Sequence, residues 1–227
     1  MGKKRSRRTL FIAVLVVVIV VLAFVIFLLS QSSQAVVPGV KAGDVFIYDI
    51  MGFWSSNDPN ATLPEAFLQL NMTEWYQITV TEVSGAEVSI STTWRFTNET
   101  ELTGTGTVNV ETGIHYPTDG FWAIYASNLK ENDQLRPLGP DRSTINETVT
   151  SDYGGGTRET NRVSLVLQYY DADDPTGSTT WTEYSNIHFD RQTGMLVELR
   201  DVSVYTNPQQ TLTILWKIKE SNVWTVT

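Results

Sequence analysis

The sequence predicts an all-β domain, either an antiparallel sandwich or a strongly curved sheet of about ten strands, preceded by one N-terminal transmembrane helix. Three observations predict this architecture. Apolar and polar residues alternate with period two in several segments after residue 44, which is typical of antiparallel strands with one buried face. Gly, Pro, Asp and Asn cluster between these segments, where turns are needed. Near the N-terminus, 20 consecutive apolar residues follow a basic cluster.

The first element is the apolar segment 10–29 (LFIAVLVVVIVVLAFVIFLL), which contains no charged residue. At 1.5 Å per residue, a helix of this length spans about 30 Å, the thickness of the hydrocarbon core of a bilayer. Residues 1–9 contain five basic residues and no acidic one, and basic tails stay in the cytoplasm. We therefore expect a signal anchor over 10–29, a cytoplasmic N-terminus, and a cell membrane protein whose remaining residues lie outside.

A cleaved signal peptide is the alternative. Small residues stand at Ser33 and Ala35, so cleavage after Ala35 would give a secreted protein. The apolar run exceeds the core of about 7–15 residues usual in signal peptides, which favours the uncleaved anchor. Residues 6–11 also resemble a twin-arginine signal, and residues 1–6 fit a myristoylation pattern. The apolar span by itself suffices for insertion.

The N-terminal tail is basic, whereas the chain after residue 29 is acidic. The 227 residues have a formal net charge of -9 and include no cysteine. After residue 29 there are 11 basic and 25 acidic residues, a formal charge of −14. The lack of cysteine excludes disulfides and cysteine sites, and an acidic body disfavours nucleic acid as a partner. We expect a linker over 30–43 and an extracytoplasmic β domain over 44–227.

Alternation predicts strands through 76–80, 88–96, 163–169 and 212–218. Ser84-Gly85 predicts a hairpin between the first two of these strands. In the C-terminal half, turn residues at 173–177, 190–194 and 207–208 separate consecutive strands. This half is therefore predicted to be a meander of hairpins.

Three segments are less regular. Residues 64–70 predict two helical turns, with Pro64 at the first helical position. Residues 121–129 predict either a buried strand or a short amphipathic helix, and their aromatic residues favour the strand. In the strand over 195–205 the apolar phase changes after Leu199, which predicts a β-bulge near Arg200-Asp201.

Four sequons predict N-glycosylation in a host that makes glycans. Their asparagines are Asn60, Asn71, Asn98 and Asn146. All four fall in predicted loops or on polar strand faces, where a glycan has room.

Metal and catalytic motifs are missing from the sequence. The acids of 171–174 resemble half of a calcium loop, but Pro175 and Thr176 break the pattern. His115 and His188 are far apart and lack zinc-site spacing. No Ser nucleophile elbow occurs, and the glycines at 154–156 do not precede a helix. We therefore predict no cofactor, no metal and no catalytic residue, although a carboxylate pair drawn from distant acids stays open.

Aromatic residues are abundant, with 7 Trp and 9 Tyr. Most tryptophans fall in predicted strands, which favours a role in the core. They are Trp75, Trp94, Trp181 and Trp216. Trp54 and Trp122 lie in less regular segments, so they are the candidates to line a groove for a lipid, glycan or peptide.

Several blocks of sequence together resemble uncharacterised archaeal membrane-anchored β-rich ectodomain proteins. They are residues 39–48, 71–75, 154–161 and 188–198. The resemblance implies a location and a β fold, and no activity. The D-x-x-T-G hairpin at 190–194 is also similar to that of curved-sheet lipoprotein carriers, which hold acyl chains in a half-barrel.

These patterns predict a non-enzymatic cell-surface or envelope module, tethered by one N-terminal span. It would act through binding or structural contacts with a surface protein, glycan or lipid. The alternative is a carrier or binder of a lipid or other hydrophobic ligand in a curved β-sheet groove. The third hypothesis is a hydrolase that uses a carboxylate pair.

Overall fold

The computed structural model describes residues 36–226 apart from 141, 154–155 and 171–179. The predicted cytoplasmic tail, anchor and cleavage site at Ala35 lie outside the described residues, as do the acidic turn after Tyr170 and the first two glycines of 154–156. Among the residues that are described, none forms a helix long and apolar enough to cross a membrane. The part that begins at Val36 is one compact unit.

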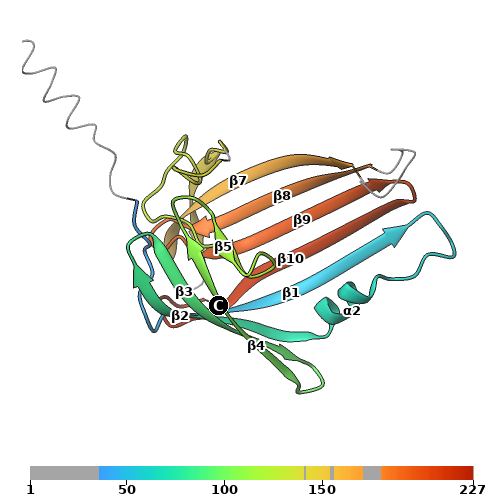
Figure 1. Cartoon of the computed structure of the whole chain (residues 1–227), viewed down its shortest axis with the longest axis horizontal. Helices are drawn as coiled ribbons and strands as arrows, with labels where there is room; N and C mark the ends of the chain where they lie inside the picture. Colours follow the sequence, from blue (N-terminus) through green and yellow to red (C-terminus); the bar gives the residue numbers. More distant parts are fainter. Residues whose placement is uncertain (1–35, 141, 154–155, 171–179, 227) are drawn as a thin grey trace, which may run out of the picture. The chain divides into compact units, whose positions relative to one another are not determined.

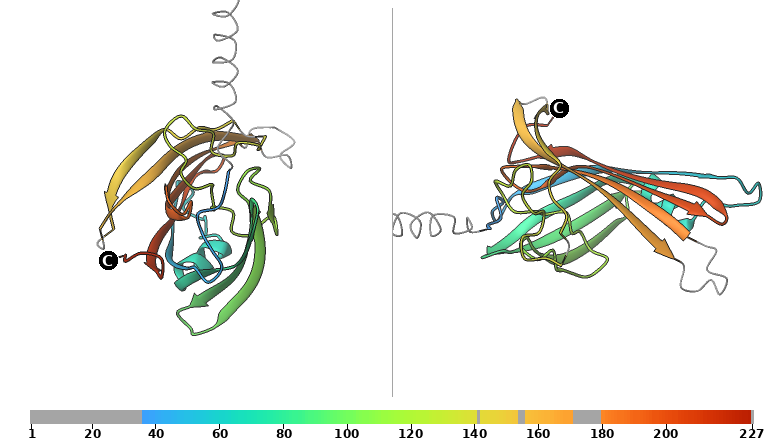
Figure 2. Two further views of the ribbon diagram at one scale, coloured as in Figure 1. Left: turned by 90° about the vertical axis from the view of Figure 1, so that its left-hand side faces the viewer. Right: turned by 90° about the horizontal axis from the view of Figure 1, so that it is seen from above.

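All ten strands of the described residues belong to one antiparallel sheet, so the all-β prediction is confirmed. A sandwich would need two sheets. Figures 1 and 2 show that the single sheet curls strongly around its inner face. The strands are β1 (Val45–Ser56), β2 (Thr73–Ser84), β3 (Glu87–Phe96), β4 (Glu101–Asn109), β5 (His115–Tyr116), β6 (Glu147–Asp152), β7 (Thr157–Tyr170), β8 (Thr180–Asp190), β9 (Leu196–Thr206) and β10 (Gln209–Ser221).

The strand order is β5-β4-β3-β2-β1-β10-β9-β8-β7-β6. Nearly every neighbouring pair is consecutive in the chain, which confirms the predicted meander in the C-terminal half. The exception is β1 with β10, which pair from Phe46↔Ser221 to Ser56↔Gln210. This pair, which we name the seam, joins the meander β1–β5 to the meander β6–β10.

Period-two alternation places the core on the inner face. On β1, Phe46, Tyr48 and Ile50 are buried while Ile47 and Asp49 between them are partly exposed. The same alternation buries Ile78 on β2, Ile90 on β3 and Val163 on β7. The predicted strands through 76–80, 88–96, 163–169 and 212–218 are confirmed, as parts of β2, β3, β7 and β10.

A long connection between β5 and β6, residues 117–146, packs on the inner face, and we name it the inner loop. It buries Ala123, Ile124, Tyr125 and Ala126. The predicted strand over 121–129, and the helix that was its alternative, are both wrong, because only isolated bridges occur there, such as Ile124↔Met195. Its backbone N–H and C=O groups form hydrogen bonds in turns and isolated bridges instead of a continuous strand ladder. The aromatic side chains are buried by packing on the sheet.

The buried side chain of Arg136 stabilises the position of the inner loop. The Arg136 side chain donates hydrogen bonds to the backbone carbonyls of Val110, Ile124 and Trp122. Its guanidinium also lies over the Tyr125 ring, 4.3 Å from the ring centre. Hydrogen bonds from a charged donor are stronger than those from a neutral one, so this side chain holds the loop in one conformation.

Part of the predicted linker 30–43 is packed on the domain. Val40 is buried, and the backbone N–H of Ser127 on the inner loop donates to the carbonyl of Val37. A Cβ at Gly39 would lie 2.0 Å from the Gln192 carbonyl oxygen. Residues 36–43 thus lie against both the inner loop and the β8–β9 turn.

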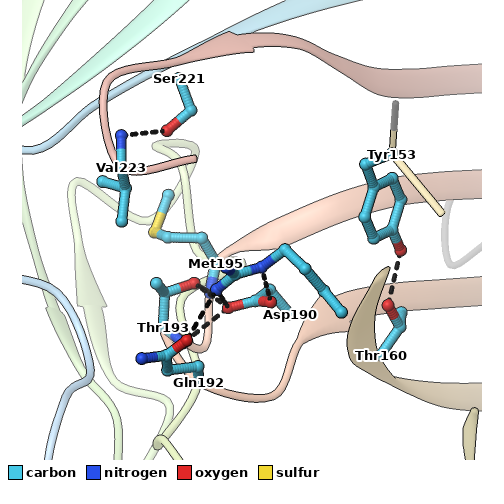
Figure 3. A network of polar contacts seen from close by, with 9 residues as sticks. Tyr153, Thr160, Asp190, Gln192, Thr193, Met195, Ser221 and Val223 are labelled. Carbon is cyan, nitrogen blue, oxygen red and sulfur yellow. Dashed lines mark hydrogen bonds and ion pairs between the residues drawn. The ribbon is translucent and has the colours of Figure 1, made fainter. Parts of the chain in front are cut away.

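The D-x-x-T-G turn between β8 and β9 has a structural role (Figure 3). The buried Asp190 carboxylate accepts from Arg158 Nε at 2.7 Å and from the backbone N–H and hydroxyl of Thr193. Gly194 has φ +76, and a Cβ there would lie 2.0 Å from the Tyr125 carbonyl oxygen. Only glycine fits this close approach of the turn to the inner loop.

The predicted bulge near Arg200-Asp201 is wrong. The register of β8 with β9 shifts earlier, between His188↔Glu198 and Phe189↔Leu196. From Leu199 onward β9 alternates regularly, so Asp201 faces inward and Val202 faces outward. The apolar phase change is therefore real, and it puts polar residues on the inner face.

The helix α2 (Glu65–Asn71) confirms the predicted helical turns, but Pro64 is not at the first helical position. It is the N-cap, with ψ 140, and the first helical residue is Glu65. β1 pairs with β2 only over Val45–Tyr48, and α2 packs beside the rest of β1. The Phe67 ring covers Gly52, where a Cβ would lie 2.8 Å from Phe67 Cδ1. The Asn71 side chain accepts a hydrogen bond from the Gly52 N–H, which satisfies part of this open strand edge.

Candidate functional site

A cavity of about 400 Å³ opens on the inner face, between the sheet and the inner loop; we name it the aromatic pocket. Strands from both meanders and the inner loop contribute to its wall. The lining residues are Tyr76, Trp94, Thr118, Asp119, Gly120, Phe121, Trp122, Ala123, Leu196, Leu199 and Trp216. Thr118 and Asp119 are exposed at its open side.

The rings of the pocket wall hold one another in place. Trp216 lies edge-on to Tyr76, with ring centres 5.0 Å apart, and it also packs against Phe121 at 5.9 Å. Trp94 contacts Tyr76, and its indole N–H donates to the Thr73 hydroxyl at 2.8 Å. Burial raises the pKa of Tyr76. The wall is therefore apolar and largely pre-formed.

Beyond the pocket, the inner face becomes acidic. Asp201 is two residues along β9 from the pocket residue Leu199 and lies opposite Ser185 and Ile214. The Ser185 hydroxyl is 2.8 Å from Asp201 Oδ1 and 3.2 Å from Glu183 Oε1. Burial raises the pKa of both carboxyls, and the charge of Asp201 raises that of Glu183 further.

An aromatic row follows at the far end of the same face. Tyr169, Trp181 and Tyr205 are directly opposite one another on β7, β8 and β9. Their rings stack, with centres 4.9 and 5.5 Å apart. Burial, and then the charges of Glu183 and Asp201, raise the pKa of both tyrosines. We name these five residues the acidic–aromatic patch.

The two predicted groove residues lie in different places. Trp122 lines the aromatic pocket, where its ring packs edge-on to Tyr125. Trp54 lies on the inner face of β1, outside that pocket, and its indole N–H donates to Gln210 Oε1 at 3.3 Å.

Trp94 and Trp216, expected in the core, line the pocket, and Trp216 also packs against the core as expected. Periodicity places them correctly on the inner face. It cannot show that the inner loop leaves space in front of them. The acidic–aromatic patch was also missed. Its signal in the sequence is the polar phase of β9, from which the sequence analysis predicts a bulge.

All four sequon asparagines are exposed. Asn71, Asn98 and Asn146 accept backbone hydrogen bonds through Oδ1. The glycan would be attached to Nδ2, which these bonds do not use, so the geometry is compatible with the predicted glycans.

The described part of the chain gives little support for a metal site or for a catalytic histidine. No group of three or more His, Asp or Glu side chains there could hold a metal ion. His188 lies half-buried on the outer face beside Glu198, and burial lowers its pKa. A second cavity, of about 430 Å³, is polar, and both of its arginines already pair with acids, Arg158 with Asp190 and Arg191 with Glu159.

Comparison with known proteins gives no match. No family model matches this chain, and no curated protein matches it. The geometry of the inner face is therefore the basis for assigning a function.

Proposed function

We propose that this protein is a non-enzymatic, membrane-tethered module that binds an apolar or amphiphilic ligand in the aromatic pocket, outside the cell. The observation that supports it is a cavity of about 400 Å³ lined by five aromatic residues and two leucines. Ligand sites are typically concave, mostly apolar and about 300–1,000 Å³ in volume. The tether rests on the apolar segment 10–29.

The proposal combines two hypotheses from the sequence, the surface module and the binder of a hydrophobic ligand. Burial of each methylene group contributes about 0.8 kcal/mol. An alkyl chain of about six carbons would therefore gain about 5 kcal/mol in this pocket, enough for measurable binding. A module held at a membrane is next to a supply of such chains, which favours a lipid.

The test uses the full-length chain in lipid nanodiscs and N-phenyl-1-naphthylamine, a neutral apolar fluorophore. Thr118 is exposed at the open side of the pocket. We expect Thr118→Trp to fill the entrance and weaken fluorophore binding at least about tenfold, which corresponds to about 1.4 kcal/mol. Thr103→Trp, at an exposed position on β4 outside the pocket lining, is the matched control.

Equal melting temperatures of the two variants would show that both are folded. Native mass spectrometry of the chain purified from membranes should in addition detect a retained lipid mass. Absence of fluorophore binding to the unmodified chain, or equal binding by both variants, would reject the proposal.

A carboxylate-pair hydrolase is the second candidate, because Glu183 and Asp201 converge near aromatic residues and have raised pKa values. The geometry disfavours it. Both carboxylates lie on one sheet surface and contact the same Ser185 hydroxyl, whereas the two carboxylates of a glycosidase flank the scissile bond. Hydrolysis of any member of a panel of nitrophenyl glycosides, lost in Glu183→Gln, would establish this function instead.

A further inference from the structure

We infer that the ligand is a cationic amphiphile, whose apolar chain occupies the aromatic pocket and whose ammonium group lies on the acidic–aromatic patch. The inference rests on the proposed function and adds the charge of the ligand.

Basic residues are missing from the segments that build this end of the sheet. No Lys or Arg occurs in 42–94, 163–190 or 201–216. These segments include α2, all of β1, β2 and β8, and the ends of β7, β9 and β10 that surround the patch. The nearest basic residues on these strands, Arg200 and Lys217, alternate onto the outer face.

The two carboxylates of the patch are incompletely bonded by the protein. Asp201 has a hydrogen bond from the backbone of Val202 as well as its contact with Ser185. Ser185 has one hydroxyl hydrogen, so it can donate fully to either Glu183 or Asp201 but not to both. No ion pair of Glu183 or Asp201 with a basic residue is found in the described part of the chain. A cation from a ligand would supply the missing charge and, if it has N–H groups, the missing donors.

The aromatic row suits an ammonium group. Cations bind favourably over aromatic faces, and aromatic cages bind quaternary ammonium groups. Because the Trp181 ring stacks between Tyr169 and Tyr205, the outer faces of the two tyrosines are the ones open to a cation. The Tyr169, Trp181 and Tyr205 rings are only partly buried. The charges of Glu183 and Asp201 act on both tyrosine hydroxyls.

The spacing matches an amphiphile. Asp201 is two residues along β9 from Leu199 in the pocket wall, about 7 Å at the rise of a strand. The one charged residue in the pocket lining is Asp119, which is also acidic. A ligand that extends from pocket to patch therefore meets apolar groups first and negative charge next, and no positive charge.

The experiment compares three water-soluble probes with the same alkyl chain: hexyltrimethylammonium, hexanol and hexanoate. Binding to the full-length chain in nanodiscs is measured by tryptophan fluorescence, with empty nanodiscs as the blank. We expect hexyltrimethylammonium to bind at least about tenfold more tightly than either other probe, and hexanoate to bind most weakly.

The variant Glu183→Gln/Asp201→Asn keeps the shape of both side chains and removes their charge. It should abolish the preference for the cation and leave hexanol binding unchanged. Glu198→Gln removes one charge from the outer face of the same strand and is the control. It should leave all three affinities unchanged.

The outcomes separate the two proposals. Similar binding of all three probes, or a cation preference that survives in the double variant, would overturn the inference and leave the proposed function standing. Binding of none of the probes would reject both.

Discussion

Glu183 and Asp201 are two partly buried carboxyls that share one hydroxyl hydrogen from Ser185. Their pKa values in the folded chain lie above the ordinary values of 4.5 and 3.8, chiefly because of burial. The folded chain thus binds more protons than the unfolded chain in this range. The stabilisation of the folded chain by proton binding to these two carboxyls is fully present below their unfolded-state pKa values. It is lost as the pH rises through their folded-state pKa values.

We therefore expect Glu183→Gln to be more stable than the unmodified chain near pH 7 and equally stable near pH 4. The groups that face Glu183 are Asp201, Ser185 and the hydroxyls of Tyr169 and Tyr205. Because the side chain is partly exposed, the gain should be small, about 2 °C in melting temperature. At each pH the melting temperature of Glu183→Gln is compared with that of the unmodified chain. A difference that is less favourable to the variant at pH 7 than at pH 4 would contradict this prediction.

At the residue scale, sequence reasoning succeeded where one local rule decides. Pro64 predicted the start of α2 to within one residue, since it is the N-cap and the helix begins at Glu65. It failed for the ring contacts of Trp216, because these depend on an inner loop that is distant in sequence.

At the scale of elements, β9 shows why a strand pattern can mislead. The bulge was predicted on the assumption that apolar side chains face inward throughout. Beyond Leu199 the opposite holds, with Asp201 and Ser203 inward and Val202 and Val204 outward. A polar inner row on an otherwise apolar face is itself a signal for a binding surface.

The helix α2 depends on one glycine of β1. A leucine at Gly52 would collide with the Phe67 ring, since even a Cβ lies 2.8 Å from it. We expect Gly52→Leu to displace α2, to cost about 1–3 kcal/mol, and to speed amide hydrogen exchange over 65–71. Met51→Leu, at an exposed position on the outer face of the same strand, should leave the exchange unchanged. Slow exchange in both variants would show that α2 is held by other contacts.

At the scale of the whole molecule, the inner loop supplies one wall of the pocket and Arg136 fastens it. Arg136→Met would remove hydrogen bonds to three backbone carbonyls. We expect a loss of about 3 kcal/mol in stability and weaker fluorophore binding, because Trp122 and Ala123 line the pocket. The control is Arg142→Met, which removes an exposed charge from the same loop. Unchanged binding in Arg136→Met would show that the loop keeps its position without this side chain.

The alternation of apolar and polar residues predicted the strands but left two architectures open. A sandwich and a curled sheet both bury one face of each strand, so their patterns are alike. Residues 117–146 decide between them, because they fill the inner face that a second sheet would otherwise cover. These residues lack periodicity, since their backbone is bonded through isolated bridges and turns.

The seam between β1 and β10 also affects how the chain folds. Each meander can form from contacts between neighbours in sequence, whereas the seam joins residues near opposite ends of the domain and carries the largest loop-closure entropy. Tyr76 and Trp94 come from one meander, and Leu199 and Trp216 come from the other. The pocket is therefore completed only when the seam closes, and any ligand it holds adds its binding energy to that slow, long-range step.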